Sequence, residues 1–192
     1  VGSTTICPGD PLPNIDINIT AGIPNWDVTY NLNGSAVTTN TAVSPLVING
    51  AAIGTYDLVS VTDGNGCTNG IAGQVVIDEF VTPVMDVMND QAICEGLNLD
   101  VNPFNSIPPG STFAWTNTSG TDVGYGLNGA GDIGSFIGVN GTGASIPTNV
   151  QVIPTSADGC VGPPSNVLIT VNPIPIIDFT GDPLVGCEPL EV

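Results

Sequence analysis

The sequence lacks every basic side chain. Its 192 residues include no lysine, arginine or histidine, whereas 18 are aspartate or glutamate, so the formal net charge is -18. No salt bridge between side chains can form. Nucleic acid is excluded as a partner, because its phosphates are bound mainly through lysine and arginine. Binding to an anionic membrane surface is excluded for the same reason.

The same absence removes most catalytic chemistry. Histidine and lysine supply the usual general bases and Schiff-base amines, and neither is present. A pair of carboxylates could still hydrolyse a glycoside. Most of the acidic residues, however, stand next to glycine or proline in expected turns. We therefore expect that the protein is not an enzyme.

Long apolar runs are also missing. No stretch is long enough to span a bilayer, and the amino terminus lacks the basic and then apolar pattern of a signal peptide. Hydrophobic residues still make up 41% of the chain and charged residues only 9%, which is unlike the composition of a disordered segment. We expect a folded, mature and soluble segment.

Helical patterns are absent, and strand patterns take their place. The 25 glycines and 17 prolines interrupt nearly every window in which apolar residues recur at helical spacing. Apolar residues alternate instead, as at Trp26, Val28 and Tyr30, which predicts strands with one buried face. Other strands are expected at 15–19, 54–62, 74–77, 97–101, 112–116, 149–153 and 166–171. The expected fold class is all-β.

Five cysteines recur at regular spacing. Cys7, Cys94 and Cys187 open the similar phrases ICPGD, ICEGL and GCEPL, whereas Cys67 and Cys160 end the turns DGNGC and SADGC. No CxxC spacing and no histidine favour zinc, so we expect disulfides. The spacing predicts the pairs Cys7–Cys67 and Cys94–Cys160, one linking the two sheets of each sandwich. Cys187 would pair within a third repeat or with another chain.

The cysteine phrases also predict the domain organisation. A first repeat is expected at 1–81 and a second at 82–174, while 175–192 would be the first strand of a further repeat or a linker. Proline marks both junctions, in EFVTPVM from Glu79 and in VNPIPII from Val171. Because these linkers are short and proline restricts the backbone, neighbouring repeats should be coupled semi-rigidly.

Several segments resemble a known group of surface proteins. GTYDLVSVTDGNGC at 54–67 resembles the closing signature of SprB-type repeats in giant Bacteroidetes adhesins. AICEG from Ala92, GSTFAWTNTSG from Gly110 and DGCVGPPSNVLITVNPIP from Asp158 resemble the PKD-like modules of the same proteins, as does the terminal IDFTGDPLVGCEPLEV. The resemblance implies tandem immunoglobulin-like (PKD-like) β-sandwiches on a bacterial cell surface, exported by type IX secretion and serving cell adhesion or gliding motility.

Calcium is the one cofactor for which the sequence offers ligands. Asp63 and Asn65 in the DGNGC turn carry the hard oxygen atoms that calcium prefers, although an Asp-Gly turn has the same composition without any metal. A second acidic group lies at the expected junction between repeats, where a cation would stiffen the hinge. Its members are Asp78, Glu79, Asp86 and Asp90.

Three functions fit these features. The leading interpretation is a non-catalytic structural or adhesive segment of a long extracellular protein, whose partners are adjacent repeats, surface glycans or other cells. A second is a filament subunit whose terminal segment from Ile176 adds a strand to its neighbour. A third is a carbohydrate-binding module, which needs an exposed aromatic platform. Trp26 and Trp115 alternate like core residues, which favours the first two.

The charge inventory yields a stability prediction. Raising NaCl from about 0.02 M to about 0.5 M shortens the screening length from roughly 20 Å to roughly 4 Å, so the melting temperature should rise as carboxylate repulsion weakens. Calcium at matched ionic strength should raise it further only if a specific site exists. Differential scanning calorimetry measures both effects. Identical curves in chelator and in millimolar calcium would remove the calcium site.

Overall fold

The computed structural model describes residues 2–178, and every regular element in that range is a β-strand. The all-β prediction is confirmed. Contacts divide the chain into two compact units, which we describe separately. The first consists of Val1–Asp86, Asn105–Phe113 and Ile153–Pro164, and the second of Val87–Phe104, Ala114–Val152 and the residues from Ser165 onward. The repeat boundaries expected at 81/82 and 174/175 remain predictions.

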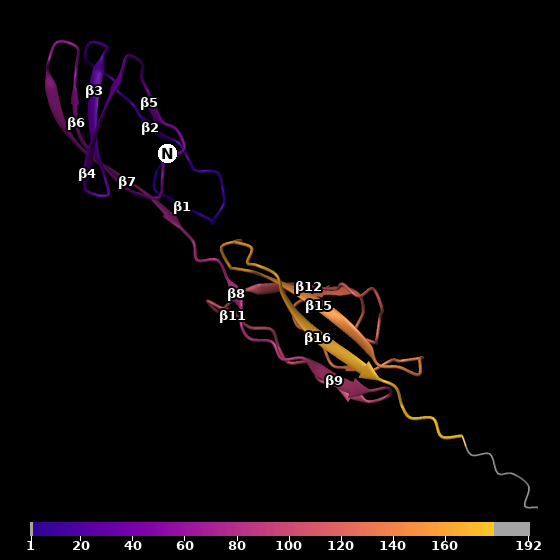
Figure 1. Ribbon diagram of the computed structural model, residues 1–192. Coiled ribbons are helices and arrows are strands. Elements are labelled where there is room, and N and C mark those ends of the chain that lie inside the picture. Colours follow the sequence, from indigo (N-terminus) through magenta and orange to yellow (C-terminus); the bar gives the residue numbers. More distant parts are fainter. Residues whose placement is uncertain (1, 179–192) are drawn as a thin grey trace, which may run out of the picture. The chain divides into compact units, whose positions relative to one another are not determined.

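A five-stranded sheet forms the larger layer of the first unit (Figure 1). Its neighbouring strands run antiparallel except for the edge strand β1, which lies parallel to β7, the last strand of the sheet along the chain. The order across the sheet is β1 (Thr4–Ile6), β7 (Thr68–Glu79), β6 (Gly54–Thr62), β3 (Trp26–Leu32) and β4 (Ser35–Thr41).

Two short antiparallel strands form the opposite layer. β2 (Ile15–Ile17) pairs with β5 (Leu46–Ile48), and both send an apolar side chain into the core. Ile15 packs with Tyr30 and Ile77 of the large sheet, and Leu46 packs with Trp26. Burial between two layers makes this unit a β-sandwich. A further pair, β8 (Val84–Met85) and β11 (Ser106–Ile107), also belongs to the first unit.

The hairpin between β3 and β4 shows how local sequence sets register. Leu32 pairs with Ser35, so only Asn33 and Gly34 form the loop. Both have positive φ angles, 50° and 81°. A two-residue loop of this kind needs left-handed backbone at both positions, which asparagine and glycine adopt most readily. The Asn-Gly pair therefore fixes the alternation that buries Trp26, Val28 and Tyr30.

The main sheet of the second unit repeats the first sheet strand for strand. Its edge strand β9 again lies parallel to the last strand, β16. β15 pairs with β16, and β12 with β13, in antiparallel orientation, like the corresponding pairs of the first sheet. The order is β13 (Asn128–Ala130), β12 (Thr112–Asn117), β15 (Ile146–Thr155), β16 (Ser165–Asn172) and β9 (Gln91–Cys94), with β10 (Asn98–Leu99) and β14 (Phe136–Ile137) as a separate pair. β12 and β15 each contribute residues to both units.

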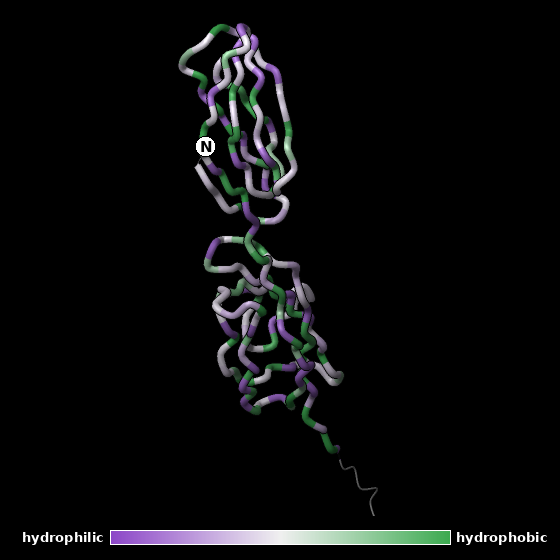
Figure 2. The backbone as a smooth tube through the Cα atoms, turned by 90° about the vertical axis from the view of Figure 1, so that its left-hand side faces the viewer, coloured by the Kyte–Doolittle hydropathy of each residue, from purple (hydrophilic) through white to green (hydrophobic). Residues whose placement is uncertain are grey.

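Alternating burial fills the core of the second unit. On β16, Val167, Ile169 and Val171 are buried, whereas the residues between them are more exposed. Figure 2 shows this interspersion of hydrophobic and hydrophilic residues along the chain. Tyr125 packs edge-on against Trp115 and Phe136, with ring centroids 5.8 and 5.1 Å apart. An aromatic cluster thus supports the alternating aliphatic core.

Ile169→Ala should test this core. The side chain is fully buried, so its truncation removes apolar contacts and leaves a cavity, which should lower the free energy of unfolding by about 2–5 kcal/mol. The matched control is Ile137→Ala, because Ile137 is 60% exposed and should cost about 1 kcal/mol or less. Urea denaturation measures both. Equal losses in the two variants would contradict the assigned burial.

Candidate functional site

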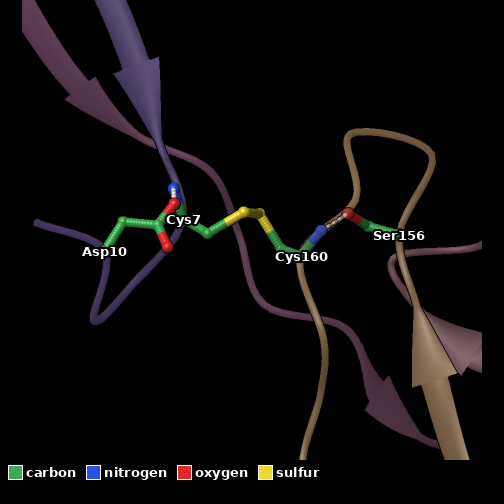
Figure 3. Close-up of a disulfide and its surroundings, with 4 residues drawn as sticks. All are labelled: Cys7, Asp10, Ser156 and Cys160. Atoms are coloured by element: carbon green, nitrogen blue, oxygen red, sulfur yellow. Dashed lines mark hydrogen bonds between the residues drawn. A yellow bond between two sulfur atoms is a disulfide. The ribbon is translucent and has the colours of Figure 1, made fainter.

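The cysteines are the most distinctive chemical groups in the described residues, and their pairing differs from the prediction. Cys7 is bonded to Cys160, with the Cα atoms 5.4 Å apart and a sequence separation of 153 residues (Figure 3). Cys67 and Cys94 are free and exposed. The predicted pairs Cys7–Cys67 and Cys94–Cys160 are therefore wrong. Cys187 lies outside the described residues.

The parallel edge strand explains why the first predicted pair cannot form. β1 ends beside the end of β7, since Ile6 pairs with Glu79, and Cys7 follows directly. Cys67 instead precedes β7, 12 residues before Glu79. Twelve residues of strand extend roughly 40 Å. Cys7 and Cys67 therefore lie at opposite ends of one long strand. A disulfide requires Cα atoms within about 7 Å, so these two cysteines cannot bond.

The second repeat has the same geometry. Cys94 pairs with Asn172 at the end of β16, whereas Cys160 precedes that strand and lies 12 residues before Asn172. Cys94 and Cys160 are therefore also placed at opposite ends of the last strand. In each repeat the opening cysteine lies where the last strand ends, and the turn cysteine lies where that strand begins.

The turn that carries Cys67 is organised by a carboxylate. The N–H of Asp63 donates to the carbonyl of Cys67 at 2.9 Å, and the N–H of Gly66 donates to the carbonyl of Asp63 at 2.9 Å. Asp63 Oδ1 accepts hydrogen bonds from the N–H groups of Asn65 and Cys67, at 3.0 and 2.9 Å. Gly66 has a φ of 83°, which glycine adopts without strain.

The turn that carries Cys160 has the same hydrogen bonds. The N–H of Ser156 donates to the carbonyl of Cys160 at 2.9 Å, and the N–H of Gly159 donates to the carbonyl of Ser156 at 3.0 Å. Ser156 Oγ replaces the carboxylate, accepting the N–H of Cys160 at 3.1 Å (Figure 3). Gly159 has a φ of 90°. Cys67 and Cys160 therefore occupy equivalent positions.

The two opening cysteines are equivalent as well. The N–H of Asp10 donates to the carbonyl of Cys7 at 3.0 Å, and the N–H of Leu97 donates to the carbonyl of Cys94 at 3.2 Å. Each of these tight turns contains a glycine of positive φ, at 89° for Gly9 and 78° for Gly96. Asp10 additionally accepts the N–H of Cys7 through its Oδ2 atom at 3.1 Å (Figure 3).

The oxygen atoms of Asp63 are already engaged by the backbone. The N–H groups of Cys67 and then Ile23 stabilise the ionised carboxylate, with a smaller contribution from Asn65, and lower the pKa of Asp63 below its ordinary value. The Ile23 N–H lies 3.3 Å from Oδ2. Asp63 therefore has the turn-forming role that its sequence allowed, and calcium binding at this turn stays a prediction.

The junction acids are dispersed among several elements. Asp78 and Glu79 end β7, and Asp78 Oδ1 accepts the N–H of Glu79 at 2.8 Å. Asp90 Oδ1 accepts the N–H of Leu168 at 2.9 Å, while the backbone N–H of Asp86 donates to Asn105. Across residues 2–178, no three histidine, cysteine or acidic side chains gather closely enough to hold a metal ion. Calcium remains a prediction for the calorimetric test above.

Both tryptophans lie inside the protein. Trp26 and Trp115 are each 7% exposed, and neither buried indole N–H has a hydrogen-bond partner. Trp26 lines a hollow of about 360 Å³ together with residues that include Asp63 and Cys67. A sugar-binding platform requires an exposed aromatic face, which neither tryptophan offers.

Comparison with known proteins finds a family of domains that part of the chain is similar to. Residues 91–175 match the family model of PKD-like domains. This segment contains every strand from β9 to β16. No curated protein matches the sequence. Together with the strand order, the match identifies immunoglobulin-like, PKD-like architecture in an all-β chain with a single disulfide among residues 2–178.

Solved structures give distant similarities. The fibronectin(III)-like modules of CbhA from Clostridium thermocellum are 16% identical, with 95% of this chain and 96% of that chain covered and a TM-score of 0.37. N-cadherin EC1-3 of Drosophila is 10% identical, with 82% and 63% covered and a TM-score of 0.37. The insect immune protein hemolin is 16% identical, with 91% and 45% covered and a TM-score of 0.35.

Domains of this architecture are typically structural or adhesive modules found outside the cell. Residues 2–178 form no helix with the length and apolar character needed to cross a membrane.

The lowered pKa of Asp63 generates a prediction about acid stability. The ionised carboxylate contributes stability that is complete above the unfolded pKa of about 3.9 and is lost as the pH falls through the lower folded value. The wild type should therefore be more stable than Asp63→Asn above about pH 4, and the difference should shrink at lower pH. Urea denaturation at a series of pH values measures it.

Ser156→Ala is the matched control, because it removes the equivalent cap from the second turn without removing a charge. Its effect on stability should not change across the same pH range. A constant difference between the wild type and Asp63→Asn at all pH values would contradict the role of the ionised carboxylate.

Proposed function

We propose that this chain is a non-catalytic structural and adhesive segment of a long extracellular protein. The observation that supports this function best is the repetition of one architecture, including both of its cysteine turns, along a single chain. Repeats in series suit a stalk that holds a binding surface away from its anchor. Adjacent repeats are then the first partners of each module.

The disulfide suits such a stalk because of the path that a pulling force takes. Cys7 lies near one end of the chain and Cys160 closes a loop with a sequence separation of 153 residues. Force applied to the two ends passes through the sulfur–sulfur bond, so most strands are shielded from tension. In the chain-entropy account, closing a loop of this size also disfavours the unfolded state by about 5 kcal/mol.

An extracellular location accords with this chemistry. Disulfides persist in oxidising compartments and are rare in the cytosol. The PKD-like match and the SprB-type phrases together support a bacterial cell-surface adhesin, exported by type IX secretion and serving adhesion or gliding motility. Other cells or surface glycans are the outer partners proposed for it.

Catalysis and sugar stacking receive no comparable support. The 192 residues include no histidine, lysine or arginine to act as base or electrophile. Burial of both tryptophans takes away the aromatic platform that a carbohydrate-binding module would use. The structural role needs neither of these features.

Single-molecule force spectroscopy tests the mechanical role. When the oxidised chain is pulled by its ends, only residues outside the disulfide loop can extend. Reduction should add about 500–550 Å of contour length, since the bond spans 153 residues and an extended residue contributes roughly 3.3–3.6 Å. The double variant Cys7→Ser with Cys160→Ser is the control and should extend fully without reductant.

Equal contour lengths for the oxidised and reduced chains would overturn the shielding role. The control variant would then show whether the bond had failed to form, because a chain with an intact disulfide should have a shorter contour length than the variant at any pulling rate.

A further inference from the structure

The two free cysteines match the two bonded ones. We propose that Cys94 forms a disulfide with Cys67 of a second copy of this chain, so that copies join head to tail. The bond would reproduce Cys7–Cys160, which already joins an opening cysteine to a turn cysteine (Figure 3). Oxidation of exposed thiols needs an oxidising setting, so the inference rests on the extracellular location proposed above.

Cys94 has the surroundings of the bonded Cys7. Cys7 directly follows the short edge strand β1, and Cys94 is the last residue of the short edge strand β9. Each of these strands runs parallel to the last strand of its sheet. Both cysteines begin a tight turn closed by an N–H three residues later, with a positive-φ glycine inside it. Cys94 is exposed and unbonded, so its sulfur is accessible to a partner.

Cys67 has the surroundings of the bonded Cys160. The two five-residue turns share their backbone hydrogen bonds, and in each a side-chain oxygen of the first residue caps the cysteine N–H. Cys67 differs in being exposed, whereas Cys160 is 1% exposed within the disulfide. An exposed turn cysteine is the state expected of the position before its partner arrives.

The placement of the cysteines along the last strand sets the direction of assembly. The opening cysteine lies where the chain leaves a repeat, and the turn cysteine lies a strand length earlier, too far away to bond within that repeat. An opening cysteine must therefore reach the turn cysteine of a following repeat. A second copy supplies that turn through Cys67 and leaves its own Cys94 for the next copy.

The bond can form by exchange with a low-molecular-weight disulfide such as oxidised glutathione. The Cys94 thiolate attacks one glutathione sulfur, forming a mixed disulfide and releasing one glutathione thiolate. The Cys67 thiolate of the second copy then attacks the Cys94 sulfur and releases the second. Two protein thiols are oxidised, one glutathione disulfide is reduced to two thiols, and the two thiol protons pass to the released thiolates.

Cross-linking of variants in the full 192-residue chain tests the proposal. All proteins carry Cys187→Ser, so that this third thiol takes no part. The parent keeps Cys67 and Cys94, while two further variants add either Cys67→Ser or Cys94→Ser. Each is incubated in a glutathione redox buffer, alone and as an equal mixture, with enough salt to screen the charge of -18 on each copy.

We expect the parent to give a reducible ladder of dimers, trimers and longer species on nonreducing gels. The mixture should stop at a dimer, because each copy then carries only one of the two cysteines. Each single variant alone should give at least about tenfold less dimer, because it could only join Cys67 to Cys67 or Cys94 to Cys94. Peptide mapping should find Cys94 linked to Cys67, using a protease that cleaves after aromatic residues, since trypsin has no lysine or arginine to cut.

Several results would overturn the proposal. Single variants that dimerise as well as the mixture would show unspecific oxidation of exposed thiols, and a Cys67–Cys94 bond inside one monomer would exclude head-to-tail joining. Absence of a dimer in the mixture would also exclude a bond between Cys94 and Cys67 of different copies. A following repeat on a longer polypeptide presents the same chemistry. A map of the natural protein that links Cys94 to a cysteine other than Cys67 would assign the bond to that source.

This test separates the joining of copies from the mechanical function. A chain that stays monomeric yet lengthens on reduction in the force measurement keeps its shielding disulfide and loses only the intermolecular bond. Loss of the Cys7–Cys160 link from the peptide map would overturn both.

Discussion

The parallel pairing of a three- or four-residue edge strand with the last strand of its sheet determines which cysteines can form disulfides. β1 pairs with the end of β7 and β9 with the end of β16, so each opening cysteine is carried to the end of a strand. The turn cysteine stays at the beginning of that strand. One strand length then separates the two sulfurs, and no disulfide can close a repeat on itself.

A chain without positive side chains must be stabilised by other means, and the turns show which ones are used. Short polar side chains accept or donate hydrogen bonds to nearby backbone, as Asp63 and Ser156 do for the cysteine turns and Asp122 does for Gly124 and Gly126. These local bonds need no cation. Alternating apolar residues supply the burial, and the carboxylates at the surface keep the charge that repels neighbouring molecules.

Sequence patterns predicted the central strands well and the edges poorly. The strand expected at 54–62 is β6 as observed, because alternation in a half-buried strand is visible in one dimension. β4 (Ser35–Thr41), rich in threonine, carries little apolar signal, and two-residue strands such as β8 and β14 are apolar but too short to show alternation, so none of them was predicted. The sulfur pairing was missed because spacing along the chain does not reveal that Ile6 lies beside Glu79. The intervals from Cys67 to Glu79 and from Cys160 to Asn172 are both 12 residues long. Their equality is meaningful only when one knows that Glu79 pairs with Ile6 and Asn172 with Cys94.

Staggered pairing changes what the disulfides can stabilise. A bond that closes one module stabilises that module alone, whereas the Cys7–Cys160 bond encloses every described strand from β2 to β15 and leaves only β1 and β16 outside its loop. The bond therefore resists the unfolding of the strands inside its loop. One turn cysteine, Cys67, and one opening cysteine, Cys94, remain exposed and unbonded among residues 2–178. A covalent series joined through these two cysteines would gain stability from its continuation, which suits the long extracellular protein proposed above.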